Sequence, residues 1–310
     1  MPVSSRTFDA ASVVGLSGHL ARAEPSLGPR IVVLGARGLL GRALARVDWS
    51  PGVVQLLGRT EGDVLDPDGL LRRLTLERPD WVINCAAFTA VDRCETEPAR
   101  AQALNGDAAG AVARICGELG ARLLHLSTDY VFDGRRAEPW SEADPPNPLS
   151  VYGRTKLAGE LAVTEALGDA ALIARTQWLY GPGGPDFVEA LRRAAEGRSR
   201  LAVVDDQRGT PTHVDTLAGL LQRLMRADAT GIVHVSASGA CSRAEWARAI
   251  FAALESPVDI ENCGTDRYPR PAPRPANSVF DLSRFRALTH HTPPAWEDDL
   301  RRALRAPEQG

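Results

Sequence analysis

A glycine-rich turn between a buried strand and a helix is the feature that most constrains this fold. Residues 31–34 form a short, fully apolar run, as a strand covered on both faces of a parallel sheet requires. Glycines follow at once with the spacing GxxGxxG, at Gly35, Gly38 and Gly41, and residues 40–47 predict a helix. Such a turn lets the backbone approach a pyrophosphate at a helix N-terminus. The segment predicts a dinucleotide site, with a plain tight turn as the alternative.

The chain continues with the other parts of such a fold. Four more apolar runs predict strands, at 53–57, 81–87, 122–126 and 171–175. An alanine-rich helix is predicted at 98–119, and Asp66 before Pro67 predicts the N-cap of an earlier helix. Successive βαβ units predict an α/β protein with a doubly wound parallel Rossmann sheet and right-handed crossovers.

The strict alternation loosens after residue 175. Short strands are predicted at 201–204, 209–213 and 232–235, and helices at 216–226 and 242–254. We therefore predict a Rossmann domain over 30–175 and a smaller C-terminal α/β lobe over 176–310, with some elements returning to the Rossmann domain. Residues 1–29 lack periodicity and predict an extension, either disordered or the product of a misassigned start codon.

Composition excludes several partners. The formal net charge is −3 and the basic residues are scattered, so no nucleic-acid partner is predicted. No apolar run approaches the ~20 residues that span a bilayer, and the N-terminus lacks the pattern of a signal peptide. We therefore expect no membrane association and a cytoplasmic protein. The cysteines are widely separated, without CxxC or paired histidines, and predict reduced thiols without a metal site or disulfides: Cys85, Cys94, Cys116, Cys241 and Cys263.

Two arginines bear on the choice of cofactor. An acidic residue after the second strand would bind the adenosine ribose of NAD, whereas an arginine suits the 2′-phosphate of NADP. Arg59 stands there, and Arg37 lies in the glycine-rich turn. The pair favours NADPH, with NADH as the alternative, while two ordinary exposed arginines explain the pattern equally well.

Polar and small residues follow two predicted strands. The strand at 81–87 ends in small residues, which let a cofactor lie across its carboxyl end. Ser-Thr-Asp follows the strand at 122–126, and Thr128 is a candidate hydrogen-bond donor to a substrate carbonyl. Alternatively, these three residues cap a turn.

Tyr152 and Lys156 are four positions apart among good helix formers, so both side chains project from one helix face. A fixed ammonium favours the phenolate and lowers the pKa of a phenol from its usual ~10. The pair predicts protonation of a carbonyl oxygen while hydride reaches the carbon. Tyr-x-x-x-Lys also arises by chance, so this interpretation depends on the other segments.

The proline-rich segment 268–275 is rigid and basic. A PxxP ligand is one interpretation. An internal loop that covers an anionic substrate is the favoured one.

These segments together resemble one family. The ordered set is GxxGxxG, VINCAAFTAVDRCE, LSTDYVFDG, SVYGRTKLAGE, ARTQWLYG, DDQRGTPT and RPANSVFDL. Over residues 30–305 the chain resembles the dTDP-4-dehydrorhamnose reductases, a branch of the extended short-chain dehydrogenases. The resemblance implies that the C-terminal lobe binds substrate. The implied reaction, in deoxysugar biosynthesis, is NAD(P)H-dependent reduction of dTDP-6-deoxy-L-lyxo-4-hexulose to dTDP-L-rhamnose.

The resemblance also implies roles for single residues. Tyr152 resembles the catalytic acid, Lys156 the lysine that binds the nicotinamide ribose and tunes the tyrosine, and Thr128 the hydroxyl that completes the triad. The implied cofactor contacts are Gly38, Leu39, Leu40, Asp63, Val64, Ala87, Phe88, Thr89 and Leu126. The implied sugar-nucleotide contacts are Thr128, Asp129 and Trp178. Gln177 stands where better-known members carry serine, which leaves the exact sugar open.

Three alternatives remain. A 4,6-dehydratase or 4-epimerase is disfavoured because related dehydratases carry Asp-Glu after the threonine, whereas Tyr130 follows Asp129 here. Another nucleotide-deoxysugar 4-ketoreductase stays open. A non-catalytic NADP-binding regulatory subunit, of the kind that partners methionine adenosyltransferase, is disfavoured by the retained Thr128, Tyr152 and Lys156. The sequence leaves the oligomeric state open, with a homodimer as one alternative.

Overall fold

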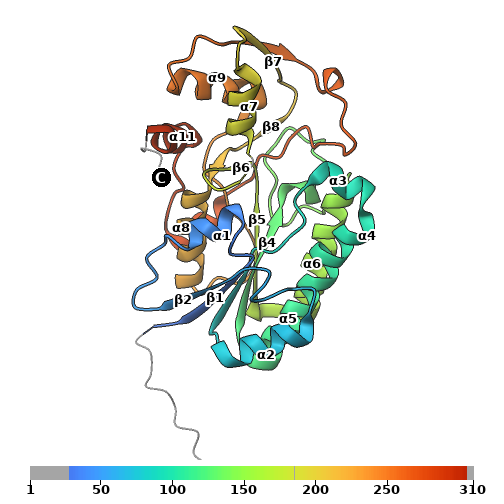
Figure 1. Ribbon diagram of the computed structural model, residues 1–310, viewed down its shortest axis with the longest axis vertical. Coiled ribbons are helices and arrows are strands. Elements are labelled where there is room, and N and C mark those ends of the chain that lie inside the picture. The colour runs from blue at the N-terminus through green and yellow to red at the C-terminus, as the bar shows by residue number, and fades with distance from the viewer. Residues whose placement is uncertain (1–27, 185, 306–310) are drawn as a thin grey trace, which may run out of the picture.

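A six-stranded parallel sheet forms the centre of the computed structural model, which describes residues 28–184 and 186–305 (Figure 1). Residues 1–27 of the predicted extension lie outside this range. The strands, in spatial order, are β2 (Val53–Leu57), β1 (Arg30–Leu34), β3 (Trp81–Asn84), β4 (Arg122–Thr128), β5 (Ala171–Thr176) and β10 (Gly231–His234). All neighbouring pairs are parallel. The predicted α/β fold with a doubly wound sheet is confirmed.

The strand order places a topological switch point at β1. Strands β2 and β3 lie on opposite sides of β1, so the connections from the first two strands leave the sheet in opposite directions. Open α/β sheets bind their ligands outside the carboxyl ends of the strands at such a point. The glycine-rich turn, which follows β1 directly, therefore lies where a ligand is expected.

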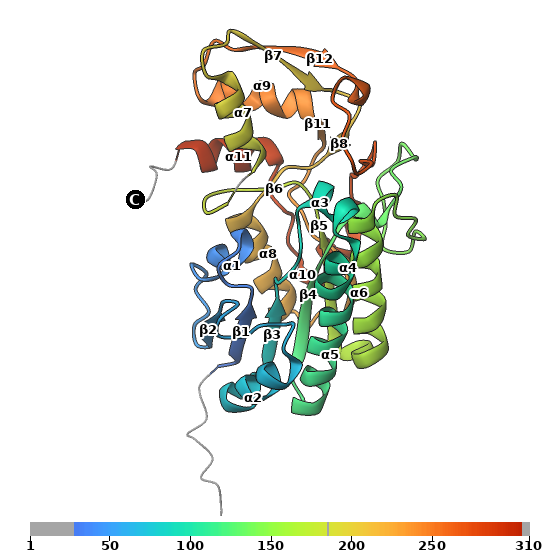
Figure 2. The ribbon, with the colours of Figure 1, turned by 45° about the vertical axis from the view of Figure 1, so that its right-hand side comes forward.

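Alternating side chains bury both faces of the sheet. Ile31 and Val33 belong to one apolar cluster, and Val32 and Leu34 to another. The first face carries α1 (Leu39–Leu44), α8 (Val214–Arg226) and α10 (Ser283–Thr289). The second carries α2 (Pro67–Glu77), α5 (Ala108–Leu119) and α6 (Val151–Leu167) (Figure 2). The elements α8, β10 and α10, which come late in the chain, thus complete the layer around the sheet.

Local signals explain where several helices begin and change. The side chain of Asp66 accepts a hydrogen bond from Gly69 N–H and caps α2, as predicted. The predicted helix at 98–119 is continuous but contains a π-helical stretch, Gln102–Asp107, between α4 (Pro98–Ala101) and α5. Within that stretch, the buried Asn105 accepts from the N–H of Phe88 and donates to its carbonyl oxygen. This contact fixes the chain just after β3.

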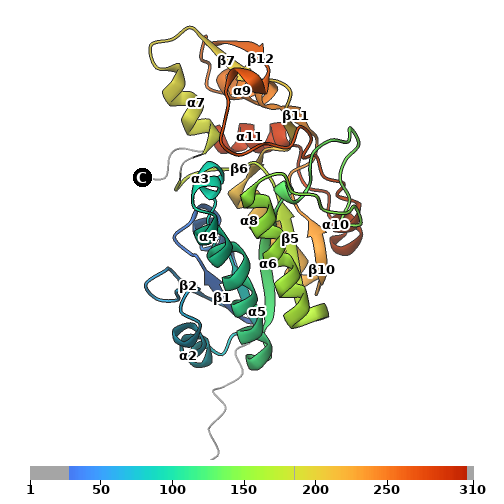
Figure 3. The ribbon, with the colours of Figure 1, turned by 90° about the vertical axis from the view of Figure 1, so that its right-hand side faces the viewer.

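An upper lobe, which we define as the elements packed around Trp246, stands above the carboxyl ends of the strands (Figure 3). It consists of α7 (Phe187–Ala195), β7 (Arg200–Val204), α9 (Arg243–Ala253), β12 (Asp259–Cys263) and α11 (Trp296–Arg305). Strands β7 and β12 pair in parallel. Trp246 is fully buried and contacts Tyr180, Phe187 and Trp178.

Short elements connect the two parts. Helix α3 (Val91–Thr96) follows β3, and 3-10 turns occur at Asp129–Val131, Gly168–Ala170 and Thr265–Arg267. The predicted strand at 209–213 is divided at Thr210-Pro211 into β8 (Arg208–Gly209) and β9 (Thr212–His213). Strand β8 pairs with β11 (Cys241–Ser242), and β9 pairs with β6 (Leu179–Tyr180). Among the described helices, none combines the length and apolar character that a membrane crossing needs.

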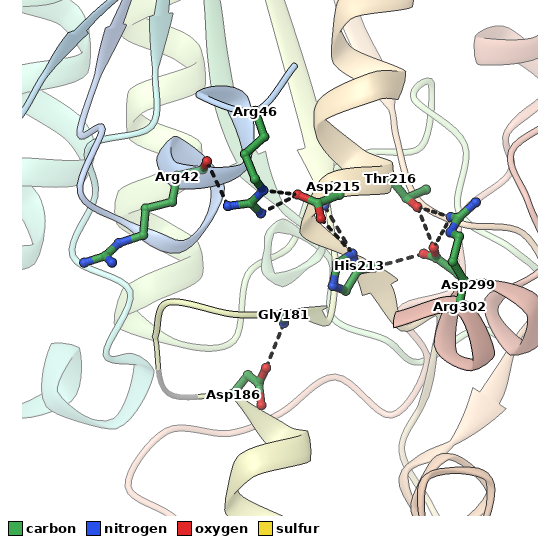
Figure 4. A network of polar contacts seen from close by, with 9 residues as sticks. All are labelled: Arg42, Arg46, Gly181, Asp186, His213, Asp215, Thr216, Asp299 and Arg302. Atoms are coloured by element: carbon green, nitrogen blue, oxygen red, sulfur yellow. Dashed lines mark hydrogen bonds and ion pairs between the residues drawn. The ribbon is translucent and has the colours of Figure 1, made fainter. Parts of the chain in front are cut away.

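A polar network holds α1, α8 and α11 together (Figure 4). Arg46, two residues after the end of α1, donates to Asp215 in the first turn of α8. The buried Asp299 on α11 accepts from His213 N–H at 3.0 Å and from the hydroxyl of Thr216. The network therefore connects the upper lobe to the helix that follows the glycine-rich turn.

Candidate active site

Two adjoining hollows lie along the carboxyl ends of β1, β3 and β4. The first has a volume of about 470 Å³ and the second about 660 Å³. Gly38, Cys85 and Ala87 line both, so the hollows form one elongated cavity. A long cavity with two compartments fits a dinucleotide better than it fits a mononucleotide.

Every predicted site residue lies on this cavity. The first hollow is lined by Gly35, Arg59, Asp63, Val64 and Phe88, together with the shared Gly38 and Ala87. The second is lined by Arg37, Leu39, Leu40, Gly41, Thr89, Leu126, Thr128, Asp129, Tyr152, Lys156 and Trp178. The cofactor and substrate roles of these residues remain predictions.

The close approach of β1 and β3 explains two of the glycines. Gly35 has a positive φ of 73°, and a Cβ there would lie 2.7 Å from the backbone nitrogen of Ala86. A Cβ on Gly41 would lie 2.6 Å from the Cα of Ala36. A larger residue at Gly35 would push the turn away from the end of β3, and one at Gly41 would push α1 away from the turn. The fold thus requires the small residues that leave room for a dinucleotide.

The two arginines predicted to choose the cofactor both form ion pairs. Arg37 donates to Glu61 at 2.7 Å, and Arg59 donates to Asp63 at 3.2 Å. Both guanidinium groups are mostly exposed, so these pairs are weak and easily exchanged for a phosphate. Their position around the cavity fits the 2′-phosphate of NADP.

The fold presents Tyr152 from the first turn of α6. Ser150 caps this helix by accepting from Gly153 N–H at 3.1 Å. A Cβ on Gly153 would lie 2.2 Å from the carbonyl oxygen of Tyr130, so glycine lets the helix approach the turn after β4. The ring of Tyr152 meets that of Tyr130 edge-on at 5.3 Å. This packing holds the phenol beside Thr128.

Burial governs the protonation of the Tyr152–Lys156 pair. Burial raises the pKa of Tyr152, and the Thr128 hydroxyl acts in the opposite direction. Burial also lowers the pKa of Lys156 to about 8, while Glu160 and Cys85 oppose this change. Lys156 is not among the groups that shift the phenol pKa in this structure, where its Nζ donates to the carbonyl oxygen of Leu126 at 2.6 Å. At neutral pH the phenol is a proton donor.

Thr128 and Asp129 form a buried polar cluster. Thr128 caps the following 3-10 turn by accepting from Tyr130 N–H, and its hydroxyl donates to Asp129 at 2.9 Å. The alternative that these residues cap a turn is therefore correct, and it leaves the hydroxyl on the cavity wall. Asp129 also accepts from Ser278 at 2.5 Å, and burial raises the pKa of its carboxyl. A hydroxyl can rotate to donate to a substrate oxygen instead.

Trp178 adopts a left-handed conformation, with φ of 47°. A Cβ on Gly209 would lie 2.4 Å from the Trp178 ring, so the indole packs directly on that backbone. Its ring also lies under the guanidinium of Arg243, whose Cζ is 3.5 Å from the ring centroid. Strained residues of this kind cluster at functional sites.

Arg243, which also lines the second hollow, was not predicted from the sequence. Ser242 and Glu245 form a capping box, and this signal does locate the start of α9 with Arg243 in its first turn. Only the tertiary packing turns that residue toward Trp178.

The structure also places Gln177 and the proline-rich segment. Gln177 lines the second hollow beside Trp178, and its amide oxygen accepts from Thr210 N–H at 2.9 Å, so the exact sugar stays open. In the proline-rich segment 268–275, Arg274 and Arg270 face Asp92 on α3 and do not line the hollows. Among the described residues, no group of three or more His, Cys, Asp or Glu is placed to hold a metal.

The chain is similar to known proteins over most of its length. The family model described as the RmlD substrate binding domain matches residues 29–308. The dTDP-4-dehydrorhamnose reductase of Mycolicibacterium smegmatis is 43% identical over 260 residues, 82% of this chain and 79% of that protein. The reductase of the same name from Escherichia coli is 37% identical over 254 residues, 78% of this chain and 85% of that protein.

A solved structure agrees with these relatives. The crystal structure of dTDP-4-dehydrorhamnose reductase from Bacillus anthracis in complex with NADP superposes with a TM-score of 0.86 at 33% identity. The match covers 89% of this chain and 99% of that one. Together with the matched family model, these similarities show that the chain belongs to the RmlD family of dTDP-4-dehydrorhamnose reductases.

Proposed function

We propose that this protein reduces the C4 keto group of dTDP-4-dehydro-L-rhamnose to give dTDP-L-rhamnose, with NADPH as the reductant and NADH as a poorer substitute. The observation that carries the proposal is the meeting of Thr128, Tyr152 and Lys156 on one cavity with the glycine-rich turn. Relatives that carry the name of this activity, and one solved with NADP, support the same conclusion.

In this proposal the elongated cavity holds the cofactor. The first hollow takes the adenosine half, with Arg59 on its wall for the 2′-phosphate and Arg37 on the adjoining wall of the second hollow. The second takes the nicotinamide half, beside Lys156 and Leu126. When bound, the cofactor supplies hydride to the C4 carbonyl carbon of the sugar.

The chain's own residues handle the proton. As the carbonyl carbon accepts hydride, its oxygen gains the electron pair and takes the phenolic proton of Tyr152. The Thr128 hydroxyl turns from Asp129 to hydrogen-bond the developing alkoxide. Lys156, which lines the same hollow, would hold the ribose of the bound cofactor, and its charge would favour the phenolate that remains. The sugar nucleotide lies on the upper-lobe side, against Asp129 and Trp178.

The alternatives fit the cavity less well. A dehydratase needs an acid and base to remove water, but the residue after Asp129 is Tyr130, whose ring meets that of Tyr152 edge-on. A non-catalytic regulatory subunit has no need for a buried, protonated phenol between a hydroxyl and a lysine. Reduction of a different nucleotide-linked keto-deoxysugar is an alternative that only assays with such sugars can exclude.

The test is NADPH oxidation with freshly generated dTDP-4-dehydro-L-rhamnose, comparing the wild-type protein with Tyr152→Phe. Turnover that collapses in the variant, with NADPH binding retained, supports the reductase and its acid together. Tight NADPH binding without wild-type turnover would favour another keto-sugar or a regulatory subunit. Equal turnover in both proteins would contradict the mechanism.

Two properties of the protein stay predictions. A homodimer is tested by light scattering on the purified chain, and a cytoplasmic location by cell fractionation.

A further inference from the structure

The Arg243 guanidinium on the second hollow is surrounded by aromatic rings. It stacks on Trp178 at 3.5 Å and lies 5.1 Å from the ring centroid of Phe187 and 5.6 Å from that of Trp246. These rings hold the planar group in one place and supply cation–π attraction. They leave its N–H donors unused.

Within residues 28–184 and 186–305, no hydrogen bond or ion pair reaches this guanidinium. Neighbouring arginines differ, since Arg274 donates to Asp92 and Arg208 lies 3.7 Å from Glu245. Asp129 is the nearest anionic candidate in electrostatic terms, but its two oxygens already accept from Thr128 and Ser278. Burial lowers the pKa of Arg243 only to about 10, so it stays charged at neutral pH. A crowded, unpaired cation is costly unless a ligand neutralises it.

The position of Arg243 in the fold indicates which of two anionic ligands it faces, the cofactor or the nucleotide-sugar substrate. It projects from α9 of the upper lobe, and Asp129 and Tyr130, which feel its charge, line the same hollow. The glycine-rich turn, which is the expected site of the cofactor pyrophosphate, follows β1 of the central sheet. Arg243 therefore belongs to the part of the cavity that the proposed function assigns to the sugar nucleotide.

We infer that Arg243 anchors the diphosphate of the nucleotide-sugar substrate, an assignment that rests on the proposed function. Thymine, deoxyribose and the deoxysugar are all neutral, so the diphosphate is the only anionic group of that substrate. A guanidinium binds phosphate oxygens through two parallel N–H bonds, a geometry that lysine lacks. The Trp178 ring packs on the backbone of Gly209 and fixes the plane of the guanidinium that stacks on it. Trp178 and Arg243 thus act as one unit.

The test separates the charge of the ligand from its shape. Binding of dTDP and of thymidine is measured by calorimetry on NADP-saturated protein, for the wild type, Arg243→Gln and Arg248→Gln. The control, Arg248, lies on the same helix but donates to the carbonyl oxygen of Ile260. We expect Arg243→Gln to weaken dTDP about 10- to 100-fold and thymidine less than about twofold. Arg248→Gln should change neither.

Steady-state kinetics give a second readout. The KM for the nucleotide sugar should rise in Arg243→Gln by a similar factor, with the KM for NADPH unchanged. Arg243→Lys, which keeps the charge but not the fork, should bind dTDP with intermediate affinity and provides the test if the glutamine variant folds poorly.

Other results would overturn the assignment. Equal losses of dTDP and thymidine would mean that Arg243 only supports the Trp178 wall. Unchanged dTDP affinity in Arg243→Gln would show that Arg243 does not contact the diphosphate. If the glutamine variant folds poorly, unchanged affinity in Arg243→Lys would show the same. If wild-type protein binds NADPH but neither dTDP nor thymidine, the proposed function fails and this inference falls with it.

Discussion

The guanidinium of Arg274 donates to both carboxylate oxygens of Asp92, with Nη1–Oδ1 and Nη2–Oδ2 distances of 2.5 and 3.0 Å. These residues are far apart in the chain, and their pairing fastens the proline-rich segment 268–275 to α3. Val91, the first residue of α3, lines the second hollow. A loop-to-helix ion pair therefore forms part of the support for the cavity wall.

Removing the charge of Asp92 should loosen that wall. We expect Asp92→Asn to lower the free energy of unfolding by about 1–2 kcal/mol, because a half-buried Arg274 loses its carboxylate. Urea unfolding measures this change. Asp298→Asn is the matched control, since its pair with Arg301 is exposed and should contribute less than about 0.5 kcal/mol. Equal effects of the two changes would count against a structural role for the Arg274–Asp92 pair.

NADPH binding should depend on the charge of Lys156. Its pKa, lowered by burial to about 8, means that the ammonium is present below that pH and lost above it. The pKa of Tyr152 is raised, so the phenol stays protonated over the same range. The Kd for NADPH, followed by fluorescence from neutral pH to about 9.5, should rise by up to about tenfold per pH unit above 8. Lys156→Met should bind weakly with no such rise, and a flat wild-type curve would disprove the assignment.

Cofactor preference should follow Arg59. We expect Arg59→Asp to lower kcat/KM for NADPH about 10- to 100-fold and to leave NADH nearly unchanged, since a carboxylate repels the 2′-phosphate. Arg72→Asp, an exposed change of the same charge on α2, is the control. Steady-state kinetics with both cofactors measure the ratio. If both variants alter the ratio equally, only the overall charge matters.

Acid should destabilise the protein partly through His234. Burial lowers its pKa to about 3, and Arg175 acts in the same direction. The usual pKa of histidine is near 6.5, so below that pH the imidazole is protonated in the unfolded chain but stays neutral in the folded chain. The free energy of unfolding therefore falls as the pH drops from about 6.5 towards 3. The contribution over that window is on the order of 4 kcal/mol. Unfolding free energies at several pH values should show a shallower slope for His234→Phe, and identical slopes would refute this account.

The buried pair of Glu160 and Arg175 should be more costly to break than any surface pair. Arg175 donates through Nε at 2.9 Å and Nη2 at 2.6 Å, and both side chains are 3% exposed. Glu160→Gln leaves a buried guanidinium without its counter-charge and should cost about 3–5 kcal/mol. Thermal or urea unfolding measures the loss. A cost below about 1 kcal/mol would show that the site admits water or a substitute anion.

The sequence predicts the sheet well because each strand is a compact apolar run. Val53–Leu57 is found with its bounds unchanged, and the strand at 122–126 extends by two residues to Thr128. Short elements of the upper lobe, such as β12 and α11, carry too few apolar residues to stand out, and their packing on Trp246 decides their structure.

The site was predictable where a residue's role follows from its place after a strand. Thr128 is of this kind, since the carboxyl ends of parallel strands meet at one edge. Tyr152 was predictable from a second signal, its four-residue spacing to Lys156 on one helix face. Arg243 was not predictable, because the sequence shows neither the absence of an acidic partner among the described residues nor the packing of its guanidinium on the Trp178 ring. The ion pair of Arg37 with Glu61 could not be predicted either, because folding brings these distant residues together, whereas Arg59 and Asp63 are only four residues apart.

Strand β10 pairs with β5 although the whole segment 177–230 separates them. During synthesis from the N-terminus, the outer edge of β5 therefore stays open until residue 234 has left the ribosome, and α8 reaches its face equally late. All six residues of β5 are buried in the finished protein, so that open edge is an apolar template for pairing with another chain. A fragment that ends within 177–230 would therefore carry this edge uncovered.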